Sequence, residues 1–202
     1  MEVLGTVSHC FDEKRLRGRL SVLPQRALVA FAAACAARLE NTAGNLSTDE
    51  ELKLLLSRTM DTVVAYLGNG LPFDTIAPEE DLLAAMPDED ANPELSSAVA
   101  EDAAAAAVYT LRAIWDGDPQ NAAWAARRAY ETADREVLST LNIGAIGDSE
   151  EAYVLQHPIV QTELQRQSRD LDAVSGIDGD APAELIAVVT SARSENILLY
   201  DL

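Results

Sequence analysis

The chain has 202 residues, of which 48% are hydrophobic and only 5% aromatic, and its formal net charge is −19. This length suits one domain, and abundant Ala and Leu with few β-branched runs indicate an all-α fold. The charge argues against a nucleic-acid partner, because phosphates must be met by a basic face, and no uncharged run approaches the roughly 20 residues of a membrane span.

The N-terminal part shows no sustained helical period and ends in a basic run, so we interpret residues 1–18 as a lead-in and 19–202 as a single helical domain. It also lacks a basic leader followed by an apolar segment. With only two cysteines, the sequence therefore favours a cytoplasmic protein without a disulfide framework or zinc site. Pro24 suits the first turn of a helix, which we expect to end between Asn41 and Gly44.

The second helix has a marked start. Ser47 with Glu50, and Thr48 with Glu51, both match a capping box, in which a hydroxyl and a carboxylate satisfy free backbone N–H groups. We expect this helix to reach about Leu67 and to be stopped by Gly68, Asn69 and Gly70.

The middle of the chain contains a short helix at 78–86 and then an alanine-rich helix at Leu95–Trp115. Small residues repeat along the latter at helical spacing, which lets neighbouring helices approach closely. We therefore expect a bundle of about seven helices arranged around this central helix.

The C-terminal part is divided by its prolines and glycines. Asp118 is expected to cap a helix that has Pro119 in its first turn. A short helix should end near His157, because Pro158 disfavours helical geometry before it and opens a new helix. The last helix is predicted at about 183–193, followed by an apolar tail that we expect to be extended and docked.

Acidic residues are concentrated in one part of the chain, since residues 59–111 contain eleven Asp or Glu and no Lys or Arg. The excess of acids has two interpretations, which are solubility or salt adaptation and the attraction of a basic protein partner. Under the second interpretation, the candidate contact residues in this stretch are Glu79, Glu80, Asp81, Asp88, Glu89 and Asp90.

Two other residues are candidate contacts for a partner. Asp102 lies beside the small-residue stripe of the central helix, where a carboxylate must be paired, capped or placed at a cleft. Trp124 points away from the alanine stripe of its own helix and could anchor a partner or lie under a loop.

Catalytic and metal-binding patterns are incomplete. Neither histidine follows an acid at three residues on a helix, so we expect His157 to serve a helix terminus, and we predict no metal site and no cofactor. Glu131 and Asp134 form a pair of the kind that helical nucleotide hydrolases use to bind magnesium, but such a pair is common on solvated helices.

Short motifs recur in an order that is similar to the bacterial YjaG-like family, which is domain-of-unknown-function family 416. The likeness covers most of the chain and rests on Arg19, Leu20, Leu23, Val29, Phe31, Arg38, Met86-Pro87, Asp102-Ala103, Pro158, Val160, Glu163 and Asn196-Ile197. The resemblance implies an all-helical, single-domain cytoplasmic protein loosely linked to signalling, without established catalytic residues to carry over.

From these observations we expect a non-enzymatic, acidic helical module that binds another protein, in signalling or in neutralising a basic toxin. The alternative is a carboxylate-based helical enzyme such as a metal-dependent nucleotide hydrolase. Its candidate residues are Asp102, Glu131, Asp134 and Glu163.

Overall fold

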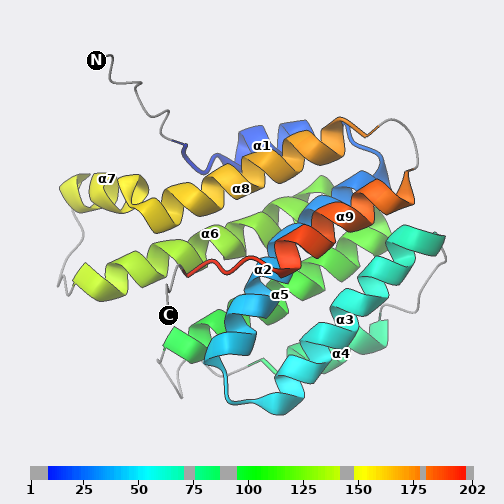
Figure 1. The fold of residues 1–202 in the computed structure, drawn as a ribbon, viewed down its shortest axis with the longest axis horizontal. Coiled ribbons are helices and arrows are strands. Elements are labelled where there is room, and N and C mark those ends of the chain that lie inside the picture. Colours follow the sequence, from blue (N-terminus) through cyan, green and yellow to red (C-terminus); the bar gives the residue numbers. More distant parts are fainter. Residues whose placement is uncertain (1–8, 71–75, 87–94, 142–147, 178–180, 199–202) are drawn as a thin grey trace.

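Nine α-helices form within residues 9–70, 76–86, 95–141, 148–177 and 181–198, the ranges that this computed structural model describes. In chain order they are α1 (Glu13–Leu20), α2 (Gln25–Leu46), α3 (Glu50–Asn69), α4 (Ile76–Ala84), α5 (Leu95–Asp116), α6 (Pro119–Leu141), α7 (Asp148–Gln156), α8 (Pro158–Ser175) and α9 (Pro182–Arg193) (Figure 1). These ranges contain no strand, which confirms the all-α, single-domain prediction. The expected count of about seven helices is close to the nine found there.

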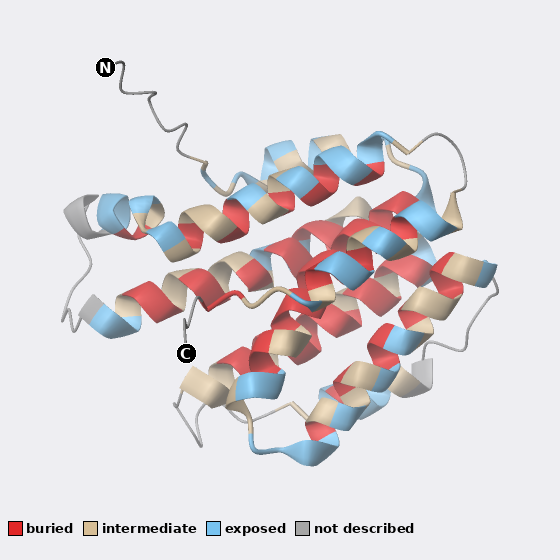
Figure 2. Ribbon diagram, viewed as in Figure 1, coloured by how far each residue is buried: buried red, intermediate tan, exposed pale blue. Residues whose placement is uncertain are grey.

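Two alanine-rich helices, α2 and α5, pack against each other at the centre of the bundle. Helix α2 also contacts α3, α6, α8 and α9, and every residue from Ala27 to Leu39 is buried. Figure 2 shows the buried residues concentrated on α2, α5 and α6. Alanine occupies all faces of α2, so helices can approach it from every side. The helix predicted at 95–115 therefore exists, but it shares the central position with α2.

The capping prediction between α2 and α3 is wrong. The N-cap of α3 is Asp49, whose carboxylate accepts hydrogen bonds from the N–H groups of Glu51 and Leu52, both at 3.0 Å. Ser47 instead closes α2, which continues to Leu46 beyond the expected end. The far end of α3 matches the prediction, because Gly70 adopts a left-handed φ of 64° there.

Part of the expected lead-in is helical. Residues 13–18 belong to α1, and Asp12 caps this helix by accepting a 2.9 Å hydrogen bond from the N–H of Arg15. Helix α1 packs on α6, and the Phe11 ring stacks on Tyr130 at a centroid distance of 5.1 Å. Helix α1 has eight residues and only two leucines, Leu16 and Leu20, which are too few to give a period, so the sequence pattern does not reveal this helix.

The C-terminal helix boundaries follow the sequence closely. Asp118 caps α6 through a 2.9 Å hydrogen bond from the N–H of Gln120, and His157 is the N-cap of α8. The tail is docked as far as the structure describes it, since Ile197 and Leu198 are buried. In the described part of the chain, no helix combines the length and apolarity needed to cross a membrane.

Candidate functional site

The acidic residues predicted to bind a partner lie on and beside α4. Glu80 and Asp81 are exposed, whereas Glu79 is half-buried and forms a 2.7 Å ion pair with Arg112 of α5. Glu79 thus has a structural partner, and Glu80 and Asp81 carry the charge that faces solvent. Asp88, Glu89 and Asp90 lie outside the described residues.

A groove of about 550 Å³ separates α3 from α4. Its lining combines leucine and alanine side chains with carboxylates at the edge, and it includes one cation, Arg58. Leu54, which lines the groove, is 49% exposed, whereas Leu83 on α4 is 46% exposed but is not part of the lining. The groove is therefore a partly apolar surface bordered by Asp49, Glu51 and Asp81.

Asp102 is buried on α5 and is held by three side chains of α6. It lies 2.7 Å from Arg135 and 3.3 Å from Arg128, and it accepts a 2.8 Å hydrogen bond from the Thr132 hydroxyl. Burial raises the pKa of the Asp102 carboxyl, although Arg135 and Thr132 act in the opposite direction. These contacts assign Asp102 the role of fastening α5 to α6.

Trp124 lies on α6, whereas α4 packs against α3 and α5. The centroid of the Trp124 ring lies 5.2 Å from that of the Tyr109 ring on α5, and Trp124 is 37% exposed. Trp124 is thus half covered by an aromatic neighbour and is carried by a helix other than those that border the groove.

A buried ionic cluster forms where α2 meets α8, and we refer to Arg38, Glu163 and Asp170 as the Arg38 cluster. Arg38 is fully buried, and its guanidinium binds both carboxylate oxygens of Glu163 at 3.0 and 3.2 Å. A third contact, of 2.5 Å, joins Arg38 to Asp170. Because two buried carboxylates face one guanidinium, one negative charge is not balanced by Arg38, and the carboxylate oxygens need further hydrogen-bond donors.

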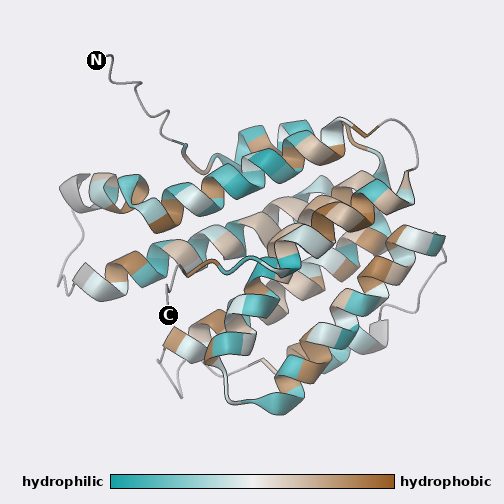
Figure 3. Ribbon diagram, in the orientation of Figure 1, coloured by the Kyte–Doolittle hydropathy of each residue, from teal (hydrophilic) through white to brown (hydrophobic). Residues whose placement is uncertain are grey.

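Those donors come from α8 itself. Gln167 gives a 2.9 Å hydrogen bond to Glu163, and Arg169 gives hydrogen bonds of 2.8 and 3.0 Å to Asp170. Much of α8 is hydrophilic (Figure 3), yet Glu163, Gln167 and Asp170 are all buried. Two of these buried side chains, Glu163 and Asp170, bind the Arg38 guanidinium, and Gln167 supports Glu163.

The C-terminal tail closes over this cluster. Glu195 pairs with Arg169 at 2.8 Å and lies 3.6 Å from Arg38. Burial opposes ionisation of Glu195, but the hydrogen bond from Arg169 and the charge of Arg38 outweigh it and lower its pKa. The next residues are fixed as well, because the N–H of Ile197 donates to the Thr42 hydroxyl at 3.0 Å.

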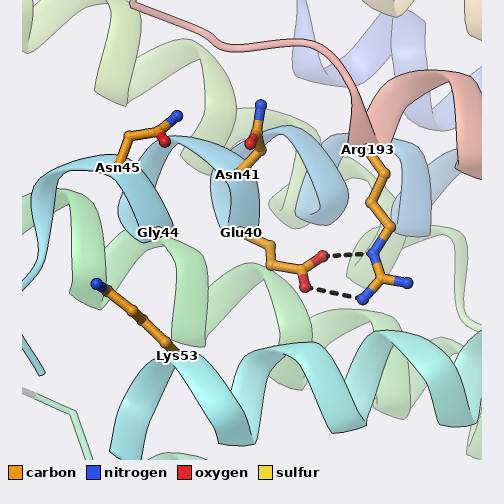
Figure 4. A pocket seen from close by; sticks show the side chains of 6 residues that line it. All are labelled: Glu40, Asn41, Gly44, Asn45, Lys53 and Arg193. Atoms are coloured by element: carbon orange, nitrogen blue, oxygen red, sulfur yellow. Dashed lines mark hydrogen bonds and ion pairs between the residues drawn. The ribbon is translucent and has the colours of Figure 1, made fainter. Parts of the chain in front are cut away.

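Figure 4 shows a second pocket, of about 440 Å³, near the C-terminal end of α2. Arg193 from α9 reaches Glu40 through two hydrogen bonds of 2.9 Å and also contacts Asp61 at 2.7 Å. Lys53, on the other side of the pocket, pairs with Glu50 at 2.8 Å. Its charged groups are thus engaged with one another, which makes this pocket a weak candidate for binding a ligand.

The four carboxylates of the enzymatic alternative are each engaged by other side chains, and two of them, Asp102 and Glu131, share Arg128 at 3.3 and 3.5 Å. Glu163 belongs to the Arg38 cluster, Asp102 is held by α6, Asp134 accepts a 3.3 Å hydrogen bond from Tyr130, and Glu131 pairs with Arg127. Within the ranges that the structure describes, no group of three or more His, Cys, Asp or Glu residues could hold a metal ion.

Sequence reasoning did not single out Asp170, Gln167 or Glu195. The available signal was that polar residues alternate with Val160, Leu164 and Leu171 on the inner side of α8, while Arg38 directly follows a run of small residues in α2. Three residues behind the family resemblance, Arg38, Glu163 and Asn196, come from distant segments and meet at this cluster and the tail that closes it.

Comparison with known proteins identifies a solved structure that has the same fold. No family model matches the chain, and no curated protein sequence matches it. A crystal structure of a DUF416 family protein from Shewanella baltica OS155 superimposes with a TM-score of 0.77 at 16% sequence identity, covering 87% of this chain and 92% of that one. At that identity the match establishes the fold alone. The chain therefore shares the fold of a DUF416 family protein, which confirms the predicted family resemblance at the level of the fold.

Proposed function

We propose that the protein is a non-enzymatic binding module that uses the groove between α3 and α4 to bind a basic, amphipathic helix of another protein. The observation that carries this proposal is the groove itself, in which exposed Leu54 is combined with the carboxylates of Glu51 and Asp81. The Asp49 carboxylate caps α3, and the two remaining acids outnumber the one cation of the lining, Arg58. Leucines supply the contact area and carboxylates select a basic partner over an acidic one.

The charge distribution supports this choice of partner. A net charge of −19 attracts basic proteins over long range and repels nucleic acid, and exposed Glu80 and Asp81 concentrate negative charge beside the groove. A partner helix would place leucine-sized residues in the groove and lysine or arginine at its edge. A basic toxin or a signalling protein would both fit this description.

The remainder of the molecule is well suited to serve as a rigid support. Asp102 and the Arg38 cluster use their charges to join helices to one another, so these carboxylates are engaged in packing. We further propose a cytoplasmic location, since the two cysteines, exposed Cys10 and buried Cys35, are both unpaired thiols.

Binding of a synthetic Leu/Lys amphipathic helical peptide, measured by fluorescence anisotropy, tests the proposal. We expect Asp81→Lys to weaken binding about tenfold at low salt, because it replaces an attraction at the groove edge with a repulsion. Glu184→Lys makes the same change of charge at an exposed position of α9 and serves as the control.

A second variant separates groove contacts from general charge attraction. Leu54→Asp increases the negative charge but removes an apolar contact, so the proposal expects weaker peptide binding. Equal effects of Asp81→Lys and Glu184→Lys, together with unchanged or stronger binding by Leu54→Asp, would reject the groove as the binding surface.

A further inference from the structure

A separate pocket of about 330 Å³ lies between α1 and α8, on elements that the proposed peptide groove does not use. The segment before α1 is fixed against α8 by a reciprocal pair of hydrogen bonds, in which the His9 N–H donates to Gln161 at 2.9 Å and the Gln161 amide donates to the His9 carbonyl at 2.8 Å. The walls of this pocket are therefore built from well-anchored elements.

A buried amide faces this pocket. Gln167 lines it and is only 6% exposed. Its Nε2 atom donates to the Glu163 carboxylate and to the Ala126 carbonyl, both at 2.9 Å, and these contacts identify the nitrogen. Among the residues that the structure describes, no donor reaches Gln167 Oε1. This oxygen keeps some solvent exposure although the residue as a whole is buried, so it is an accessible acceptor to which a ligand N–H or O–H group could donate.

The α1 wall of the pocket is basic in a strongly acidic protein. Arg15 and Arg19 both line the pocket. Within the described ranges Arg15 forms no ion pair, and Arg19 uses one guanidinium nitrogen to bind Asp172 at 2.6 Å. Asp12 also lines the pocket, but its carboxylate caps α1. Two guanidinium groups at one wall favour an anion, above all a carboxylate or phosphate that can accept paired hydrogen bonds.

The remaining lining is largely apolar, because Leu16 from α1 faces Leu164 and Leu171 from α8. We propose that this pocket binds a small organic carboxylate that has an apolar body and one hydrogen-bond donor. The carboxylate meets Arg15 and Arg19, the donor meets Gln167 Oε1, and the apolar body lies on the leucines. A volume of about 330 Å³ is at the small end of the range for ligand pockets, which limits the ligand to a metabolite-sized molecule.

Isothermal titration calorimetry with N-acetyl-L-phenylalaninate tests this assignment, because that probe carries a carboxylate, an N–H donor and an apolar ring. We expect a Kd of about 1 mM or tighter. The methyl ester of the probe lacks the charge and inorganic phosphate lacks the apolar body, so both should bind at least about tenfold more weakly.

The matched pair of variants is Arg15→Gln and Arg17→Gln. Arg17 lies on the same helix, but it contacts Gln120 at 3.0 Å and does not line the pocket. Arg15→Gln should weaken binding of the probe about tenfold, and Arg17→Gln should leave it unchanged. Gln167→Met should also weaken it, with circular dichroism confirming that this variant is folded.

Three results would overturn the proposal. They are the absence of saturable binding by the wild-type protein, equal binding of the acid and its ester, and equal effects of Arg15→Gln and Arg17→Gln. None of them bears on the α3–α4 groove, so this proposal and the proposed function can fail independently.

Discussion

Replacing Arg38 with methionine should destabilise the protein severely. The guanidinium makes three contacts of 3.2 Å or less with Glu163 and Asp170, and both acids are almost completely buried. Removing one partner of a buried ion pair costs about 3–5 kcal/mol, because the remaining charge is left without compensation. In a domain of this size, each kcal/mol lowers the melting temperature by roughly 2–4 °C, so we expect a decrease on the order of 10 °C.

The assay is chemical and thermal unfolding followed by far-ultraviolet circular dichroism. Arg127→Met is the control, since Arg127 is exposed and its 2.7 Å pair with Glu131 spans one helical turn. Such a pair contributes about 0.3–0.5 kcal/mol. A triple variant that combines Arg38→Met with Glu163→Gln and Asp170→Asn leaves no charge unpaired, and it should recover at least half of the lost free energy of unfolding.

The reasoning about the Arg38 cluster fails under either of two outcomes. In the first, Arg38→Met unfolds within about 1 kcal/mol of the wild-type protein, as a surface pair would. In the second, the triple variant is no more stable than Arg38→Met, which would mean that lost packing, and not uncompensated charge, causes the destabilisation.

Two further predictions concern buried titratable groups. Burial raises the pKa of Asp102, so the folded state binds a proton more tightly than the unfolded state and this group favours folding increasingly as the pH falls. The wild-type protein should therefore gain stability relative to Asp102→Asn between about pH 7 and about pH 4, as measured by urea unfolding, and a relative loss would contradict the direction of the shift. Burial also raises the pKa of the Cys35 thiol, whereas Cys10 is exposed. A maleimide should modify Cys10 in the folded protein and reach Cys35 only after unfolding, and mass spectrometry of the Cys10→Ser variant would reveal any earlier reaction.

Local signals in the sequence predicted helices well where one residue type dictates the backbone. Asp118 before Pro119 marks the start of α6, and Gly70 marks the end of α3, because a cap or a left-handed residue acts within a few positions. The boundary near Ser47 was misplaced because three candidate caps stand within three residues, and the actual length of α2 selects Asp49.

The Arg38 cluster was beyond the reach of such signals. An arginine among alanines indicates a buried cation, but its partners Glu163 and Asp170 are separated from it by 125 and 132 positions. Nothing in a helical period says which two helices will be neighbours. The same limit applies to the α1–α8 pocket, since its basic wall lies in a stretch whose helical nature was missed.

The long separation along the chain between Arg38 and its acidic partners also constrains biosynthesis. A ribosome adds about 5–20 residues per second, so the 125 residues that separate Arg38 from Glu163 take roughly 6–25 s to make. During that interval Arg38 has neither of its buried acidic partners, Glu163 and Asp170, and Glu195 is synthesised later still. Helix α2 can therefore form the buried ion pairs of Arg38 only after Glu163 and Asp170 have been synthesised.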